Sequence, residues 1–225
     1  MKMKQTEILH VVLAVAIGTA WMSTVAHAGV PDQYGRTVLD DNPVSYWRFD
    51  GINRGDVENT AGYSHAGKAI GQSALCRTGA RPPRYLTTPK DNKALEIPGQ
   101  GYVKVADPGD DSELDFGLGD TITVEAWIDL HNINNDQNIY IVGKGRTNND
   151  GFPRENQNYA LRLRGIDGTA RLSFLFRGDG KNQDKPADYH RWNSNAGFPP
   201  GSGWHHVAVT YTFGKPDSLR GYIDG

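Results

Sequence analysis

The sequence predicts an all-β fold, a jelly-roll sandwich of two packed antiparallel sheets. After residue 28, apolar residues rarely recur at the spacing of a helix. They alternate instead with polar residues in short runs, which is the pattern of half-buried strands. Gly, Pro, Asn and Asp separate these runs and permit tight reversals. Many short strands joined by many reversals close most simply into two sheets.

The first 28 residues predict a secretory signal peptide. Lys2 and Lys4 give a positive start, residues 11–26 carry no charge, and small residues flank a cleavage position at Ala28. A membrane anchor is the alternative, but the uncharged stretch is shorter than the ~20 residues of a spanning helix. We therefore expect a secreted, periplasmic or cell-surface protein with a mature domain at 29–225.

Nine segments carry the alternating pattern and are expected to be strands. They lie near 44–50, 94–97, 102–106, 121–130, 139–143, 159–164, 172–177, 204–212 and 219–223. Gly99 and Gly101 predict a tight hairpin between the second and third of these strands. The dipeptide Asp167-Gly168 predicts another hairpin, in LRLRGIDGTARLSFLF. We expect each of these strand pairs to lie side by side.

Two long segments, 51–92 and 178–203, interrupt the strands. Each exceeds the ~12–15 residues of an ordinary loop, which predicts a functional or poorly ordered segment. The second segment brings together aromatic, guanidinium and amide side chains, the groups that sugar recognition uses. These ligand-site candidates are Tyr189, Arg191, Trp192 and Asn193. The alternative is that Trp192 and Tyr189 only pin a loop to the body of the protein.

Trp127 interrupts the apolar pattern of DTITVEAWIDL. The aliphatic residues of this strand point between the sheets, whereas Trp127 points the other way, between Glu125 and Asp129. The ring either offers a sugar-stacking surface or is covered by a long loop. The covered arrangement is favoured because large aromatic side chains are usually well buried.

The charge of the chain limits its partners, and its cysteine content limits its disulfides. The chain has 24 Lys and Arg against 26 Asp and Glu, a formal net charge of −2, and no block of basic residues. This predicts neither a nucleic-acid partner nor membrane insertion after signal cleavage. Cys76 is the only cysteine, so no internal disulfide can form.

Five motifs occur in one order: VSYWRFDG, KALEIPGQGYVKV, DTITVEAWIDL, YALRLRG, and GWHHVAVTYTF followed by LRGYIDG. Together they resemble the laminin G-like, pentraxin-related branch of the concanavalin A-like lectin/glucanase superfamily. The resemblance implies a concanavalin A-like jelly roll that binds a glycan or an extracellular protein. It also implies a Ca²⁺ site in the complete domain, held by Asp50, the carbonyl of Gly99 and an Asp on a further C-terminal strand.

The same resemblance predicts that the domain lacks C-terminal strands, because the family pattern continues beyond the turn at Gly225. An edge strand without its neighbour exposes unpaired backbone groups, which favour association with other chains. We therefore expect the 225-residue chain to be marginally stable and prone to aggregate when expressed alone.

The adjacent histidines of GWHHVAVTY do not form a metal site. His205 shares a strand face with Val207, and His206 shares the opposite face with Trp204, so the two imidazoles diverge. We expect His206 to be a structural histidine, hydrogen-bonded inside the sandwich, because buried polar groups need partners.

No pair of catalytic carboxylates is visible. Retaining glycosidases place two carboxylates ~5–5.5 Å apart. The closest motif, ELDFGL, has Glu113 and Asp115 but Leu118 where a third carboxylate is needed. Glu125 and Asp129 share a face but lie roughly 13 Å apart along their strand. The sequence therefore predicts no catalytic residues.

The acidic run at residues 106–120 leaves two interpretations open. Its oxygens suit Ca²⁺, but an acidic loop that keeps a sheet edge soluble is favoured. The sequence as a whole predicts an exported, non-catalytic module that binds a glycan or protein surface, within a larger polypeptide. A glycoside hydrolase or lyase of the same fold and a structural spacer are the alternatives.

Overall fold

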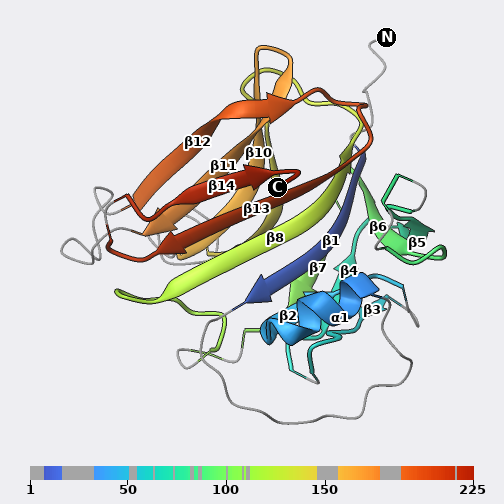
Figure 1. Ribbon diagram of the computed structural model, residues 1–225, viewed down its shortest axis with the longest axis horizontal. Helices are drawn as coiled ribbons and strands as arrows, with labels where there is room; N and C mark the ends of the chain where they lie inside the picture. Colours follow the sequence, from blue (N-terminus) through green and yellow to red (C-terminus); the bar gives the residue numbers. More distant parts are fainter. Residues whose placement is uncertain are drawn as a thin grey trace.

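The described part of the chain forms antiparallel β-sheets, as the alternating pattern predicts, and one short helix (Figure 1). The computed structural model describes residues 8–16, 33–50, 55–62, 64–72, 74–81, 84–85, 88–99, 101–107, 109, 112–145, 157–177, 189–215 and 217–225. The elements are β1 (Ile8–Ala16), α1 (Gln33–Asp40), β2 (Pro43–Trp47), β3 (Asp56–Val57), β4 (Gly67–Ile70), β5 (Ala74–Thr78), β6 (Lys93–Pro98), β7 (Tyr102–Val105), β8 (Thr121–Leu130), β9 (Asn138–Lys144), β10 (Tyr159–Ile166), β11 (Thr169–Arg177), β12 (Tyr189–Phe198), β13 (Trp204–Thr212) and β14 (Arg220–Ile223).

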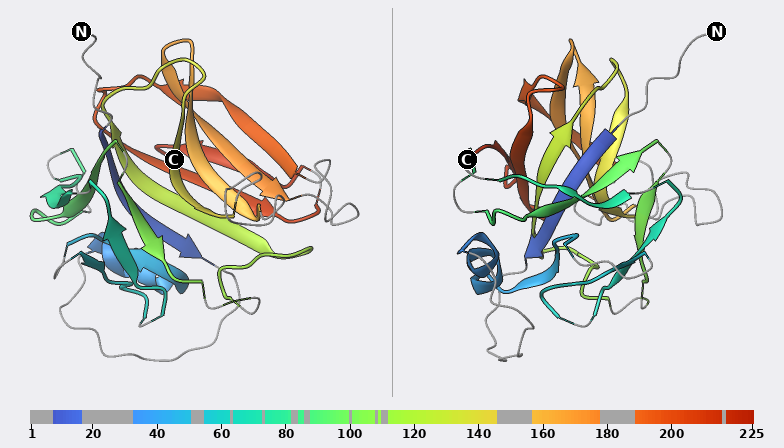
Figure 2. Two further views of the ribbon diagram at one scale, coloured as in Figure 1. Left: turned by 180° about the vertical axis from the view of Figure 1, so that it is seen from behind. Right: turned by 90° about the vertical axis from the view of Figure 1, so that its right-hand side faces the viewer.

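The strands form three hydrogen-bonded sheets. A seven-stranded sheet has the order β14-β13-β8-β1-β6-β5, with β2 also paired to β1. A four-stranded sheet has the order β12-β11-β10-β9, and a three-stranded sheet has the order β3-β4-β7. In the right-hand view of Figure 2, α1 lies on one side of β1 and β8, and β9 and β10 lie on the other. The seven-stranded sheet is therefore the central layer.

The hydrophobic core lies between the seven-stranded sheet and the other two. The inward side chains of β8, such as Ile122 and Ile128, pack with Leu161 of β10 and Phe174 of β11, and all are fully buried. Val57 of β3 joins the same cluster, which assigns the three-stranded sheet to the second layer. The predicted jelly-roll sandwich is thus confirmed, with its second layer divided in two.

Strand β1 lies inside the predicted signal peptide. It is paired with β8 along one edge and with β6 and β2 along the other. Cleavage after Ala28 stays a prediction, and it would remove β1 and leave the facing edges of β6 and β8 without these partners. Within the described ranges, no helix combines the length and the apolar character needed to span a bilayer.

One of the two predicted hairpins is confirmed and the other is wrong. Strands β10 and β11 pair directly, and Asp167 (φ 52°) and Gly168 (φ 72°) adopt the left-handed conformations of a type I′ turn. Strands β6 and β7, in contrast, belong to different sheets. Because β6 pairs with β1 and β5 while β7 pairs with β4, Gly99 (φ 76°) turns the chain from one layer to the other.

The long segment 51–92 is not a single loop. It contributes β3, β4 and β5, which pair with β4, β7 and β6. These strands have two to five residues. A run this short carries too few alternations to be distinguished from a loop by its sequence.

Candidate functional site

The part of the predicted ligand loop that carries the four candidate residues is a strand. Tyr189–Phe198 forms β12, the edge of the four-stranded sheet, and pairs with β11. The prediction of a loop over 178–203 is therefore wrong for these residues. Polar side chains occupy both faces of β12, and its register with β11 shifts between Arg171 and Ser173, so no clean alternation marks the strand.

Strand geometry separates the ligand candidates into two groups. Trp192 lies opposite Phe174, whose side chain is in the core, so Trp192 faces the interior. Arg191 and Asn193 point to the outer face of the four-stranded sheet, the face turned away from the core. The structure places the backbone of Tyr189 opposite Arg177. Arg191 and Asn193 therefore remain together, and Trp192 does not accompany them.

The ring of Trp192, on β12, packs against β14. Trp192 is partly buried against the core, and its ring lies 2.5 Å from the position that a Cβ atom on Gly221 would occupy. Only glycine at position 221 leaves room for the ring this close. The placement favours the interpretation in which Trp192 is a packing residue.

The outer face of the four-stranded sheet brings together polar groups from three further strands. The guanidinium of Arg162 donates from Nε to Ser173 Oγ at 3.0 Å and from Nη1 to the Tyr140 hydroxyl at 3.4 Å. Asn193 lies opposite Ser173, and its Oδ1 is buried with no hydrogen-bond partner in the described part of the chain. Arg191 is exposed beside them. A polar ligand can donate a hydrogen bond to the Oδ1 of Asn193 and accept one from the guanidinium of Arg191.

Sequence reasoning missed Arg162, Ser173 and Tyr140 as members of this group. The signal that could have found them is the alternation Leu-Arg-Leu-Arg in β10, which places successive arginines on one face. The predicted β10–β11 hairpin then brings Arg162 opposite Ser173.

Two tyrosine rings pack on Trp127. The rings of Tyr34 from α1 and Tyr85 from the long segment 51–92 lie edge-on to it, at centroid distances of 6.1 Å and 5.1 Å. The Tyr85 hydroxyl donates to the carbonyl of Trp204 at 2.7 Å, which holds the Tyr85 ring in place. Trp127 also lines a pocket of about 480 Å³ together with Trp204 and His206. The covered ring and the sugar-stacking surface therefore both stay predictions.

The two histidines diverge as predicted, but their roles are exchanged. His206 faces outward, where it packs on Trp127 at 5.3 Å, and its Nε2 lies 3.6 Å from a Glu125 carboxylate oxygen. The expectation that His206 is hydrogen-bonded inside the sandwich is wrong.

His205 is the hydrogen-bonded histidine. Its Nδ1 lies 2.7 Å from Asp224 Oδ2, its Nε2 lies 2.7 Å from Ser202 Oγ, and its ring stacks on Phe198 at 4.3 Å. The order Ser-His-Asp is that of a hydrolase triad. However, the Ser202 hydroxyl donates to the carbonyl of Pro199 at 2.5 Å, and Asp224 also accepts the backbone N–H of His206. The two bonds of Asp224 tie the end of β14 to β13, which is a structural role.

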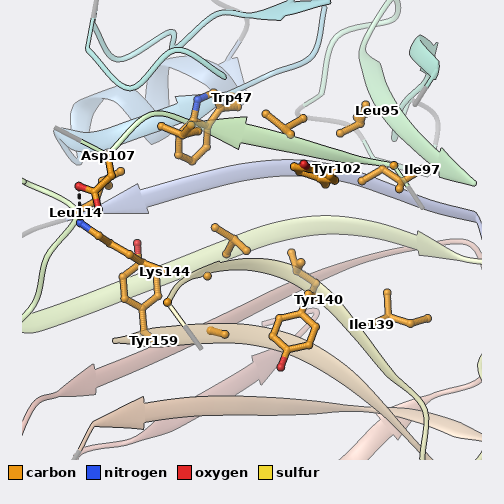
Figure 3. A pocket seen from close by; sticks show the side chains of 18 of the residues that line it. Trp47, Leu95, Ile97, Tyr102, Asp107, Leu114, Ile139, Tyr140, Lys144 and Tyr159 are labelled. Atoms are coloured by element: carbon orange, nitrogen blue, oxygen red, sulfur yellow. Dashed lines mark hydrogen bonds and ion pairs between the residues drawn. The ribbon is translucent and has the colours of Figure 1, made fainter. Parts of the chain in front are cut away.

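A pocket of about 610 Å³ opens between β7 and β9. Figure 3 shows Trp47 and Tyr102 on one side of it and Tyr140 and Tyr159 on the other. At its rim Lys144 is paired with two members of the acidic run, Asp107 at 3.1 Å and Asp115 at 2.7 Å.

The ion pairs of Lys144 give the acidic run a local structural role. The N–H of Gly109 and the ammonium of Lys144 lower the pKa of Asp107. Two carboxylates of the run are thus already compensated by one cation, which favours the interpretation of a surface loop over that of a Ca²⁺ site.

The expected calcium ligands do not fit a Ca²⁺ site as arranged here. Asp50 is paired with Arg48 at 2.9 Å, and Gly99 follows β6 as a turn residue that can offer one carbonyl. Calcium takes ~6–8 oxygen ligands. The described residues contain no group of three or more His, Cys, Asp or Glu side chains that could hold a metal ion.

We accordingly expect Ca²⁺ to leave the thermal stability of this chain unchanged. A metal that binds only the folded state at a hundredfold excess over its Kd would add about 2.7 kcal/mol. The measurement is the melting temperature in excess CaCl₂ and in EDTA. A rise that EDTA reverses would contradict this expectation and would direct attention to the carboxylates of residues 107–120.

Comparison with known proteins gives the same family as the motifs. The model of the family described as the concanavalin A-like lectin/glucanases superfamily matches residues 98–225, which is more than half of the chain. No curated protein and no solved structure matches it. The matched region starts at the last residue of β6 and contains β7 to β14, including all the outer-face residues described above. The chain therefore belongs to the concanavalin A-like lectin/glucanase superfamily.

Proposed function

We propose that this protein is an exported, non-catalytic binding module whose ligand is a glycan, bound on the outer face of the four-stranded sheet. The observation that carries the proposal is the grouping of Arg191, Asn193 and Arg162, with the Oδ1 of Asn193 buried and without a hydrogen-bond partner in the described part of the chain. Sugar hydroxyls both donate and accept hydrogen bonds, so a hydroxyl can donate to this oxygen and accept from a neighbouring guanidinium.

Export and the absence of catalysis are parts of the proposal with separate support. Export is inferred from the leader-like residues 1–28. The non-catalytic role is supported by Glu125 and Asp129, which share the outer face of β8 but are engaged separately. Glu125 lies near His206, and Asp129 lies 3.9 Å from His131. These two carboxylates are therefore not arranged as the general acid and the nucleophile of a glycosidase.

Binding to an array of neutral and acidic glycans tests the proposal. We expect Asn193→Ala to weaken binding by about tenfold, because it removes the amide that contacts the ligand. Thr123→Ala, on the outer face of the opposite sheet, is the control and should bind as the unmodified protein does. The folded state of each variant is checked by its urea midpoint.

Three other results would each point elsewhere. Loss of binding in Thr123→Ala but not in Asn193→Ala would place the ligand on the seven-stranded sheet. Release of reducing ends from a polysaccharide would support the alternative of a glycoside hydrolase or lyase. Absence of binding to every glycan would favour a protein ligand or a structural spacer.

A further inference from the structure

By strand alternation, five arginines lie on the outer face of the four-stranded sheet. Arg177 is at the end of β11, and the other four are grouped. Arg162 and Arg164 are two residues apart on β10, Arg171 lies opposite Arg164 on β11, and Arg191 lies on β12. We call this group the arginine face. The whole chain has a formal net charge of −2, so the positive charge is a local property of this face.

Among the described residues, no buried anion accompanies the buried cation of Arg162. This residue is 5 % exposed, and its hydrogen-bond partners, Ser173 and Tyr140, are both neutral. Burial lowers the pKa of Arg162, and the nearby charges of Arg191 and Arg164 lower it further, against the opposing effect of Tyr140. An arginine stays charged in proteins, so this site carries an uncompensated charge that an anion would stabilise.

The carboxylates near the arginine face do not compensate it. Asp136 pairs with Arg164 and Asp167 lies 3.8 Å from Arg171, and these two carboxylates are 85 % and 86 % exposed. Ion pairs exposed to this degree contribute little. No ion pair to Arg162 or Arg191 occurs among the described residues. Arg191 is the exposed arginine of this group, so a ligand in solution can reach its guanidinium.

We propose that the glycan bound by this protein is anionic, and that its sulfate or carboxylate groups bind to Arg191 and Arg162 beside the amide of Asn193. This inference rests on the proposed function and adds the ligand class. Guanidinium groups bind planar or tetrahedral oxyanions through paired charge-assisted hydrogen bonds, which makes arginine better suited to this task than lysine. The unpartnered Oδ1 of Asn193 accepts a hydroxyl of the same glycan.

Dextran sulfate, polygalacturonate and unmodified dextran are suitable probes. They offer sulfate, carboxylate and a neutral backbone, so they identify the anion as well as the need for one. We expect dextran sulfate or polygalacturonate to bind at least about tenfold more tightly than dextran. Arg191→Gln should remove most of this preference, and Arg191→Lys should restore only part of it.

Arg220→Gln is the matched control. Arg220 is an exposed arginine on the seven-stranded sheet, and within the described ranges it donates to the carbonyls of Asp217 and Leu219. Its substitution should change binding by less than about twofold. An equal loss in Arg191→Gln and Arg220→Gln would show nonspecific attraction and would overturn the inference.

Two results separate this inference from the proposed function. Tight binding of neutral glycans with no effect of Arg191→Gln overturns the anionic ligand and leaves the binding module in place. Absence of binding to all three probes and to the glycan array removes both. An anion preference that Arg191→Gln abolishes, in a variant with an unchanged urea midpoint, supports both.

Discussion

Gly165→Ala is expected to destabilise the protein by about 3 kcal/mol or more, one of the largest effects of a single methyl group in this fold. A Cβ atom at position 165 would lie 1.9 Å from the carbonyl oxygen of Asn134. The backbone there cannot move away, because Gly165 donates to the carbonyl of Gln137 and accepts from the N–H of Asp136. The loop before β9 is therefore fixed against the end of β10. The measurement is urea unfolding, with the midpoint and the m-value fitted together.

Gly168→Ala is the control for this prediction. Gly168 has a left-handed φ of 72°, but a Cβ there would meet no atom within 4 Å. Its substitution should cost about 1–2 kcal/mol, through backbone conformation alone. If Gly165→Ala is no more costly than Gly168→Ala, the close approach of residues 134–137 to β10 is wrong.

Trp192→Ala is expected to lower the free energy of unfolding by about 2–3 kcal/mol and to leave glycan affinity nearly unchanged while the protein stays folded. The ring fills the space between β12 and Gly221 of β14, so its removal leaves a cavity at the edge of the sandwich. Chemical denaturation and glycan binding are measured on the same preparation.

Arg191→Ala, at the residue before Trp192, is the matching test of a side chain that we expect to bind the ligand without contributing to packing. Its exposed side chain should contribute less than about 0.5 kcal/mol to stability, whereas its loss should weaken the ligand. The opposite result, an unchanged urea midpoint with lost binding in Trp192→Ala, would place the ring in the ligand site, as the sequence pattern alone suggested.

Strands with strict alternation could be predicted to the residue. Thr121–Leu130 and Trp204–Thr212 have the same bounds in the sequence prediction and in the structure. Each pairs with strands on both sides in the middle of the seven-stranded sheet, so one face must be apolar. Strand β12 lies at an edge with a register shift, so neither constraint operates there and its sequence predicts a loop.

The candidate site could be predicted only in part. The chemistry of Arg191 and Asn193 marks them as candidates, but their placement beside Arg162 and Ser173 depends on the register of three strands. The same limit explains the exchanged histidines. Alternation assigns their faces correctly, but the partner of His205 is Asp224, which only the β13–β14 pairing brings within reach.

If residues 1–28 direct export, the pairing of β1 within the sheet makes folding and export compete. A leader peptide is recognised while it is unfolded, yet residues 8–16 are paired along both edges in the folded sheet. A chain that folds before export has residues 8–16 paired within the sheet, where they are not accessible as a leader. A chain that is exported and cleaved first lacks β1, and a different strand must then complete the sheet between β6 and β8. The ratio of the folding rate to the export rate then decides which of the two proteins the cell makes.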